Sequence, residues 1–276
     1  MSGTTRTIYP HPFSRNYWRD AAREMKDVRM LVFAALMLAL RLALKTVKIP
    51  IGPSLNINVQ FFVTALGSMV YGPVLATLCG VLSDTLGYLI APSGVYFPGF
   101  IITEAAGGLA FALLLYRAKL TPGRVILSRF CVNFFVNIIL QTPIMVLYYR
   151  VAMGRGYAWF DLPRIVKNLM LFPFESVLLI LFLRAAMPAL RRVGITGSTA
   201  EELKMSGPAI LQLAGLTILS CGAVQLYFYW MRDKFLDKLP ESVLASPVLG
   251  IILAGVGIIC IAGAALLHKK DENKSI

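Results

Sequence analysis

The sequence predicts an all-α, polytopic membrane protein. Hydrophobic residues make up 57% of its 276 residues and charged residues only 15%, whereas soluble domains are about 25% charged. The mean hydropathy is +0.70. Apolar runs of about 20 residues recur along the chain, which is the length that a helix needs to cross a bilayer. These runs are too long and too continuously apolar for barrel strands, and no stretch between them is large enough for a soluble domain with an activity of its own.

Two groups of membrane helices are expected. The first group has helices at 30–49, 57–71, 74–91, 98–117, 124–149 and 162–187, and the second at 208–231 and 247–267. The second and third helices are short and meet at Tyr71-Gly72-Pro73, because glycine and proline interrupt helices. We therefore expect a cytoplasmic N-terminal segment (1–28), a six-helix membrane domain (29–192), a cytoplasmic linker (193–207), and a C-terminal transmembrane hairpin with a short tail (208–276).

The cations indicate the orientation of the chain. If the N-terminus is cytoplasmic, 17 of the 27 Lys and Arg residues fall on the inner side, as the positive-inside rule requires. Both termini are then cytoplasmic. The N-terminal segment is basic but has no short apolar core with a cleavage site, so no signal peptide is expected. Of the ten other cations, seven have almost no acidic neighbours outside the helices: Arg41, Lys45, Lys48, Arg150, Arg155, Arg164 and Lys167.

Several chemistries are not expected from the sequence. The chain has only two histidines, both near its ends, and its four cysteines lie singly within apolar runs. It therefore carries no zinc-site spacing, no triad histidine and no paired redox cysteines. A phosphate-binding GxxxxGK[ST] loop is also absent. We predict no metal, no cofactor and no catalytic residue.

The first helix has two different faces. Ala35, Ala39 and Ala43 form a stripe of small residues, which allows another helix to approach closely. Arg41 and Lys45 lie on nearly the opposite side. A charge inside the membrane usually faces a partner or a water-filled cavity, so Arg41 predicts a cavity that receives an anion. Lys45 has the alternative of extending to the membrane surface.

Polar residues recur deep in the other helices. Asn133, Asn137 and Gln141 repeat every fourth residue, a pattern that serves either contacts between helices or a ligand site. Three acids are expected in the membrane: Asp84, Glu104 and Glu175. They have two possible roles, which are pairing with Arg41 or Arg164 and accepting hydrogen bonds from the amino groups of a heterocycle.

Aromatic and basic residues gather at the predicted outer side. Arg164 and Lys167 share a face at the start of the helix at 162–187. The loops at 94–100 and 154–160 contribute Tyr96, Phe97 and Trp159. Such aromatic residues either anchor the chain at the membrane interface or cover a flat ring.

Residues 29–192 resemble the substrate-binding S components of energy-coupling-factor (ECF) vitamin importers, and among them the folate group. The pieces that carry the resemblance, in chain order, are Ala35/Ala39/Ala43, Gly72-Pro73, Leu82-Ser83-Asp84-Thr85-Leu86-Gly87-Tyr88, Pro92-Ser93-Gly94, Tyr96-Phe97-Pro98-Gly99-Phe100, and Leu162-Pro163-Arg164-Ile165-Val166-Lys167-Asn168 followed by Pro173 and Glu175. They cover about three fifths of the chain. S components usually end after six helices, so the hairpin at 208–267 departs from the family.

The resemblance implies a multi-pass protein of the bacterial plasma membrane that captures folate, or a related anionic vitamin, from the outer side. It also implies docking of the alanine stripe on a transmembrane coupling protein driven by two ATPase subunits, so this chain itself is not an enzyme. The implied ligand contacts are Arg41, Lys45, Arg164 and Lys167 for carboxylates, Tyr96, Phe97 and Trp159 for rings, and Asp84 or Glu104 for the pterin amino group. Asn137, from the polar repeat, is a further candidate contact.

Three alternatives remain open at this stage. The first is an S component for a different vitamin or precursor. The second is a self-contained secondary transporter, which predicts inverted repeats and broken helices. The third is an intramembrane enzyme with Asp84 or Glu104 as acid or base, although no paired nucleophile, metal set or suitable histidine accompanies them.

Overall fold

The computed structural model describes residues 8–9, 11–50, 56–92, 94–157, 159, 161–194, 203, 205–230 and 246–274. Ser93 and most of the expected linker at 193–207 lie outside these residues. The chain divides into two compact units, Met1–Lys204 (unit 1) and Met205–Ile276 (unit 2). Helices dominate both units, which confirms the predicted all-α class. Within the described residues, four helices are long and apolar enough to cross a membrane: Gln60–Ile90, Pro122–Ala152, Arg164–Arg192 and Val248–Lys269.

The N-terminal segment contains a helix that the sequence analysis missed, α1 (Arg15–Glu24). The Ser14 side chain caps it by accepting a hydrogen bond from the N–H of Tyr17, which is a favoured N-cap arrangement. Tyr17 and Ala21 are fully buried, and the Tyr17 hydroxyl donates to the carbonyl oxygen of Ala112 at 3.0 Å. The segment therefore packs on the membrane helices through one face of α1.

The first membrane helix is shorter than predicted. The expected range 30–49 comprises the helix α2 (Val28–Ala43), the 3₁₀ turn η1 (Leu44–Thr46) and the strand β1 (Lys48–Pro50), which pairs antiparallel with β2 (Asn56–Asn58). Val47 and Ile49 are β-branched, and Pro50 disfavours a helical conformation in the residue before it. The prediction of helix up to residue 49 was wrong for this reason.

The helix α3 (Gln60–Ile90) folds back on itself at Gly72, where φ is 82° and ψ is −179°. Glycine is the residue that adopts such a conformation without strain. Thr64 and Asp84 line one cavity, although a straight helix would place them about 30 Å apart. The predicted turn between two short helices is therefore confirmed.

The rest of unit 1 is helical. It consists of α4 (Gly99–Leu115), α5 (Pro122–Cys131), the π-helical segment η2 (Val132–Leu140), α6 (Gln141–Ala152) and α7 (Leu162–Arg192). The segments α5, η2 and α6 run on as one rod, which was predicted as a single helix at 124–149. With α2, the two arms of α3, α4 and α7, the described part of unit 1 has the six rods that the sequence predicts.

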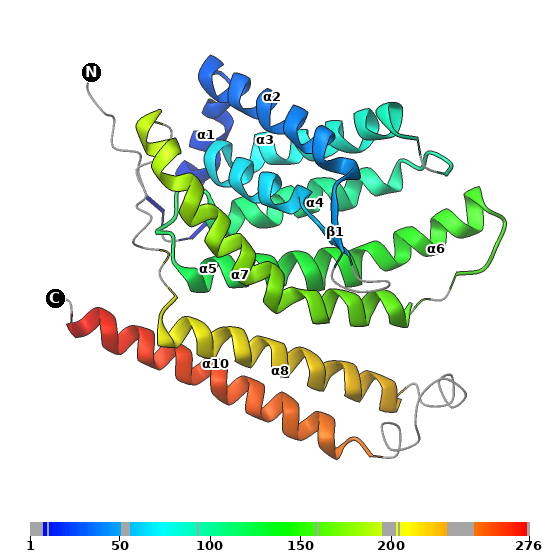
Figure 1. Cartoon of the computed structure of the whole chain (residues 1–276), viewed down its shortest axis with the longest axis vertical. Coiled ribbons are helices and arrows are strands. Elements are labelled where there is room, and N and C mark those ends of the chain that lie inside the picture. Colours follow the sequence, from blue (N-terminus) through cyan, green and yellow to red (C-terminus); the bar gives the residue numbers. More distant parts are fainter. Residues whose placement is uncertain are drawn as a thin grey trace. The chain divides into compact units, whose positions relative to one another are not determined.

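Figure 1 shows how these rods are arranged. α3 and α6 finish, and α4 and α7 begin, at one end of unit 1, which we call the distal end. The α4–α5 connection and α1 lie at the opposite end. The rods thus run lengthwise between two ends, as helices that cross a membrane must.

The second arm of α3 packs very closely against α4. A Cβ atom at Gly80 would lie 2.6 Å from the Glu104 carbonyl oxygen, and one at Gly108 would lie 2.8 Å from the Ala76 carbonyl oxygen. Glycines on both helices thus let the two backbones approach, as is common between membrane helices. This close packing brings Asp84 and Glu104 to the same cavity.

Unit 2 is a hairpin of α8 (Gly207–Trp230) and α10 (Val248–Lys274). A Cβ atom at Gly222 would lie 2.6 Å from the Ala254 nitrogen, and one at Gly257 would lie 2.6 Å from the Leu219 nitrogen. The two helices therefore meet through glycines along their length.

We predict that Gly80→Ala destabilises the protein because its new methyl group has no space against the α4 backbone. Overpacking of this kind costs about 1–3 kcal/mol. The melting temperature of the full chain in detergent measures the effect. Gly107→Ala is the matched control, because a Cβ atom there meets nothing within 4 Å. Equal melting temperatures for the two variants would contradict the packing argument.

Candidate functional site

A cavity of about 270 Å³ lies within unit 1. Its wall is unusually polar for the interior of a membrane domain, because charged, amide and hydroxyl side chains outnumber apolar ones. The polar lining residues are Arg41, Asp84, Glu104, Arg129, Asn58, Gln60, Asn137, Gln141, Thr64 and Thr103, and the aromatic ones are Phe61, Phe100 and Phe111. Four predicted site residues thus come together here: Arg41, Asp84, Glu104 and Asn137.

Arg41 is buried and paired rather than free. Its guanidinium forms an ion pair with the Glu104 carboxylate, and its backbone carbonyl oxygen accepts from the Gln60 amide at 3.1 Å. The Arg41 side chain is 9% exposed and that of Glu104 is 38% exposed. The carboxylate, more than the guanidinium, therefore faces the open space of the cavity.

The polar side chains around the cavity offer mainly hydrogen-bond acceptors. The hydroxyl groups of Thr64 and Thr103 each donate to a backbone carbonyl of their own helix, which leaves their oxygen lone pairs for a ligand. The Asn137 amide nitrogen donates to both Asn133 and Asn168, so the Asn137 carbonyl oxygen remains available. Asp84 has no hydrogen-bond partner among the described residues.

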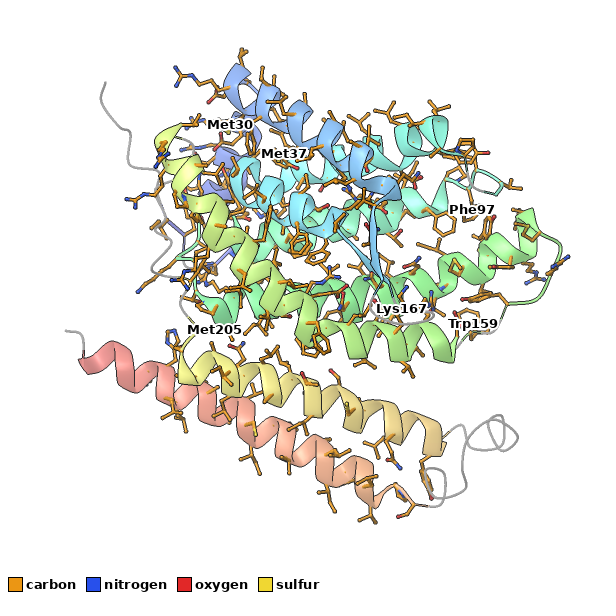
Figure 2. All side chains as sticks on the ribbon, in the orientation of Figure 1. Met30, Met37, Phe97, Trp159, Lys167 and Met205 are labelled. Atoms are coloured by element: carbon orange, nitrogen blue, oxygen red, sulfur yellow. The ribbon has the colours of Figure 1, made fainter. Side chains whose placement is uncertain are left out.

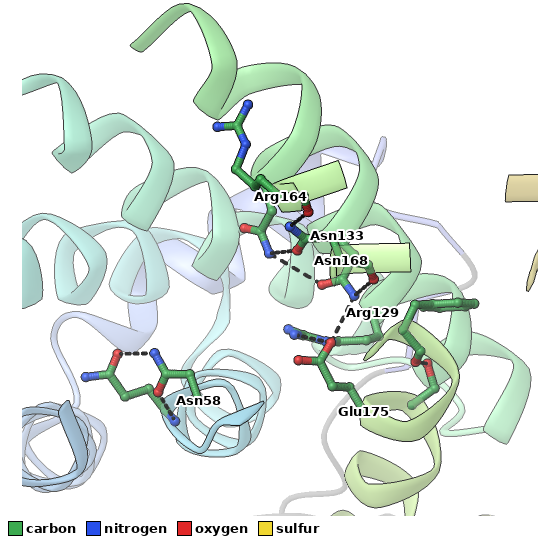
Figure 3. A network of polar contacts seen from close by, with 10 residues as sticks. Asn58, Arg129, Asn133, Arg164, Asn168 and Glu175 are labelled. Atoms are coloured by element: carbon green, nitrogen blue, oxygen red, sulfur yellow. Dashed lines mark hydrogen bonds and ion pairs between the residues drawn. The ribbon is translucent and has the colours of Figure 1, made fainter. Parts of the chain in front are cut away.

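A buried polar cluster supports the cavity from the side of α7 (Figure 3). Glu175 accepts from Arg129 at 2.7 Å and from Asn133 at 2.9 Å. The Arg129 guanidinium also lies 4.1 Å from the centre of the Phe61 ring. The two charged side chains are 6% and 7% exposed. The sequence analysis expected Arg41 or Arg164 as the partner of Glu175, so it missed the pair with Arg129.

The remaining predicted cations do not line the cavity. The Lys45 amine lies against Gly87, within a turn of Asp84. Arg164 donates to the Thr142 hydroxyl, while its Nε and Nη1 atoms are buried without a partner. Lys167 lies beside Arg164 on the first turns of α7, at the distal end (Figure 2).

The predicted aromatic residues also lie toward the distal end. Figure 2 places Phe97 and Trp159 there, far from Met30. The Phe97 ring is 5.8 Å from the ring of Phe100, which lines the cavity. Tyr96 shares a hydrogen bond with the Thr85 hydroxyl at 3.2 Å. Phe97 thus contacts a residue of the cavity wall, Phe100, and Trp159 is exposed.

The loop that carries Trp159 is held by its neighbouring tyrosine. The Tyr157 hydroxyl donates to Asp161 at 2.8 Å, and its ring stacks on Tyr149 with 4.7 Å between centres. Burial and this hydrogen bond raise the pKa of Tyr157 to about 12. Tyr157 therefore stays protonated and keeps the start of α7 tied to its loop at physiological pH.

The alanine stripe of α2 lies on the surface of unit 1. Ala35, Ala39 and Ala43 are all exposed, whereas Ala34 and Arg41 on the other side of α2 are buried. The exposed side therefore offers a row of small residues on which another helix can pack closely.

Comparisons with known proteins agree with this architecture. Residues 25–160 match the family model described as "ECF-type riboflavin transporter, S component". The chain is 28% identical over 155 residues to the "Folate transporter FolT" of Clostridium novyi, covering 56% of this chain and 88% of the relative. It is also 28% identical over 152 residues to that of Leuconostoc mesenteroides, covering 54% and 81%.

Among solved structures, the chain is similar to one titled "Crystal structure of FolT bound with folic acid". That similarity has a TM-score of 0.47 and 25% identity, and it covers 54% of this chain and 88% of the other. The sequence matches to the family model and to two separate relatives fall on a membrane domain built around a polar cavity. Through residues 25–160, this chain is similar to the S components of ECF-type transporters.

Proposed function

We propose that unit 1 is the substrate-binding subunit of an ECF-type importer and that its substrate is folate. The two relatives named as folate transporters support this assignment. In the proposed cycle, the protein captures the vitamin from outside the cell, and a partner module driven by ATP brings it across the bacterial plasma membrane.

The acceptor-rich wall of the cavity is the observation that carries the choice of substrate. The pterin ring of folate presents its amino group and a ring N–H as donors. Asp84, Glu104 and the Asn137 carbonyl oxygen offer acceptors for them. Hydrogen bonds to charged groups contribute about 1.5–3 kcal/mol each. Phe100 and Phe111 supply apolar walls for a flat ring.

The size of the cavity suggests how the rest of folate binds. At about 270 Å³, the cavity lies just below the range of about 300–1,000 Å³ typical of sites for drug-sized ligands. It suits the pterin, and the glutamate tail then extends toward the distal end. There Arg164 has two unpartnered buried nitrogens, and the planar guanidinium fits a carboxylate well. Lys167 adds a second cation.

In this arrangement Arg41 acts on the substrate through Glu104. The ion pair fixes the position of the Glu104 carboxylate, while the Arg41 Nε atom is buried without a partner and is free to bind an acceptor of the ligand. Lys45 contributes positive charge near Asp84. Tyr96, Phe97 and Trp159 cover the ligand from the distal side.

The partners follow from the same proposal. The exposed alanine stripe (Ala35, Ala39 and Ala43) is the surface for a transmembrane coupling protein, and two ATPase subunits supply the energy. The N- and C-termini are cytoplasmic and the distal end faces outward, in agreement with the excess of cations predicted on the inner side. In this proposal the chain binds folate and delivers it to the coupling protein, and the ATPase subunits hydrolyse ATP.

Riboflavin is the second candidate, because the matching family model carries that name. The flavin ring presents mostly acceptors and a single ring N–H, so it suits a wall of donors. The cavity has the opposite character, and this difference favours folate.

We predict that the purified full chain binds folate without ATP or partner proteins, because the cavity is already formed within unit 1. Isothermal titration measures the affinity, and riboflavin added in excess should leave the folate isotherm unchanged. Heat with riboflavin and none with folate would reverse the assignment of the substrate. The absence of heat with both would overturn the folate proposal.

We predict that Asp84→Asn weakens folate binding by roughly tenfold to a hundredfold, which corresponds to the loss of one charged hydrogen bond. Asp27→Asn is the matched control, because Asp27 caps α2 away from the cavity and asparagine caps helices equally well. If Asp84→Asn bound folate as tightly as the wild type, Asp84 would have no contact with the ligand.

We predict that Ala39→Trp retains folate binding but abolishes uptake, because the indole ring prevents close approach of the coupling protein. Titration and uptake of labelled folate by cells that contain the partner module measure the two effects. Ala185→Trp places the same ring on an exposed position of α7 and should preserve both. Normal uptake by Ala39→Trp would show that the docking surface lies elsewhere.

A further inference from the structure

We propose that the outward face of α1 binds anionic phospholipid headgroups at the membrane surface. This basic face of α1 consists of Arg15, Arg19 and Arg23, which follow each other at every fourth position and are all exposed. Residues at this spacing lie on one side of a helix. The site is separate from the cavity and from the alanine stripe.

The acids and the arginines of α1 lie on different sides of the helix. Both of its acids turn toward the protein, where Arg117 pairs with Asp20 at 2.6 Å and with Glu24 at 3.0 Å. Asp20 also contacts Arg23 at 3.7 Å, but the Arg23 side chain remains 65% exposed. Because both acids face Arg117 rather than solvent, the outward side of α1 is left strongly cationic.

Large apolar side chains accompany these cations. Phe13 is 88% exposed, Trp18 is 41% exposed and Met25 is 40% exposed. A helix with cations on one side and Trp, Phe or other apolar residues beside them is typical of helices that lie in the membrane interface. An acidic protein surface would attract the cations alone, whereas a lipid surface also accommodates the exposed rings.

The position of α1 in the chain brings this face to the membrane. Three residues separate the end of α1 from the start of α2 at Val28. The apolar side chains Leu31, Val32 and Leu36 of α2 are exposed, as lipid-facing residues are. The Tyr17 hydrogen bond to Ala112 holds α1 against the end of α4. The cations are therefore fixed near the level where the helices enter the bilayer, within reach of headgroup charge, which acts over about 8–10 Å.

Quenching of Trp18 fluorescence by brominated lipids tests the proposal. The full chain with Trp159→Phe and Trp230→Phe, which leaves Trp18 as its single tryptophan, is placed in vesicles of phosphatidylglycerol and phosphatidylcholine at equal mole fractions. Bromine is carried by one lipid at a time. Each cation at an anionic surface favours the anionic lipid by roughly fivefold. Brominated phosphatidylglycerol should therefore quench Trp18 clearly more than brominated phosphatidylcholine, and high salt should reduce the difference.

Two matched variants complete the experiment. Neutralising the basic face of α1 (R15Q/R19Q/R23Q) should remove the preference for phosphatidylglycerol, whereas neutralising three exposed arginines of α7 (R184Q/R191Q/R192Q) should preserve it. Melting temperatures near that of the parent show that the variants remain folded. Equal quenching by the two lipids, or an unchanged preference in the α1 variant, overturns the proposal. Absence of quenching by either lipid does so as well, since α1 is then away from the bilayer.

Discussion

The structure of unit 1 depends on the pairing of charges that are buried among membrane helices. Arg41 pairs with Glu104, and Arg129 pairs with Glu175. A lone charge in such surroundings is costly. Removing one member of the buried Arg129–Glu175 pair costs about 3–5 kcal/mol, and the cost is smaller for the other pair because the Glu104 side chain is 38% exposed. One pair ties α2 to α4, and the other ties α5 to α7. The two pairs therefore fix the positions of four of the six rods relative to the cavity between them.

The same pairing decides the chemistry of the cavity. The formal charges that line the cavity balance, with Arg41 and Arg129 against Asp84 and Glu104. Each guanidinium, however, is engaged with a carboxylate, and the donors of Thr64, Thr103 and Asn137 are engaged with backbone carbonyls or with other amides. What remains for a ligand is largely a set of acceptors. The unpartnered nitrogens of Arg164 lie outside the cavity. Acceptors for the donors of a ligand and cations for its carboxylates are therefore separated along the axis of unit 1.

The sequence alone predicted the features that follow from hydropathy and backbone chemistry. The six rods come from apolar runs, and the reversal at Gly72 comes from a glycine followed by proline. Arg41 and Glu104 were singled out because charges are rare in membrane helices, and both line the cavity.

Other features were beyond such reasoning. The partner of Glu175 depends on which helices become neighbours, and Arg129 is close to Glu175 only after α5 packs on α7. The helix α1 is mainly polar, so hydropathy did not reveal it. Its signal was the Ser14 cap together with Tyr17, Ala21 and Glu24 on one face. The β1–β2 pair was missed because three-residue strands leave almost no periodicity, although Pro50 marked the end of the preceding helix.

The short helix α2 connects the cavity with the alanine stripe, and the proposed function needs both. Because the chain leaves the helix after Ala43, Arg41 lies in its last turn, where it contacts Glu104 on α4 and Gln60 at the start of α3. The opposite side of that helix carries the exposed alanine stripe. A ligand that binds Glu104 therefore acts on the residue that anchors the end of α2. In the proposed importer, the Arg41–Glu104 ion pair thus connects a ligand in the cavity to the helix that meets the coupling protein.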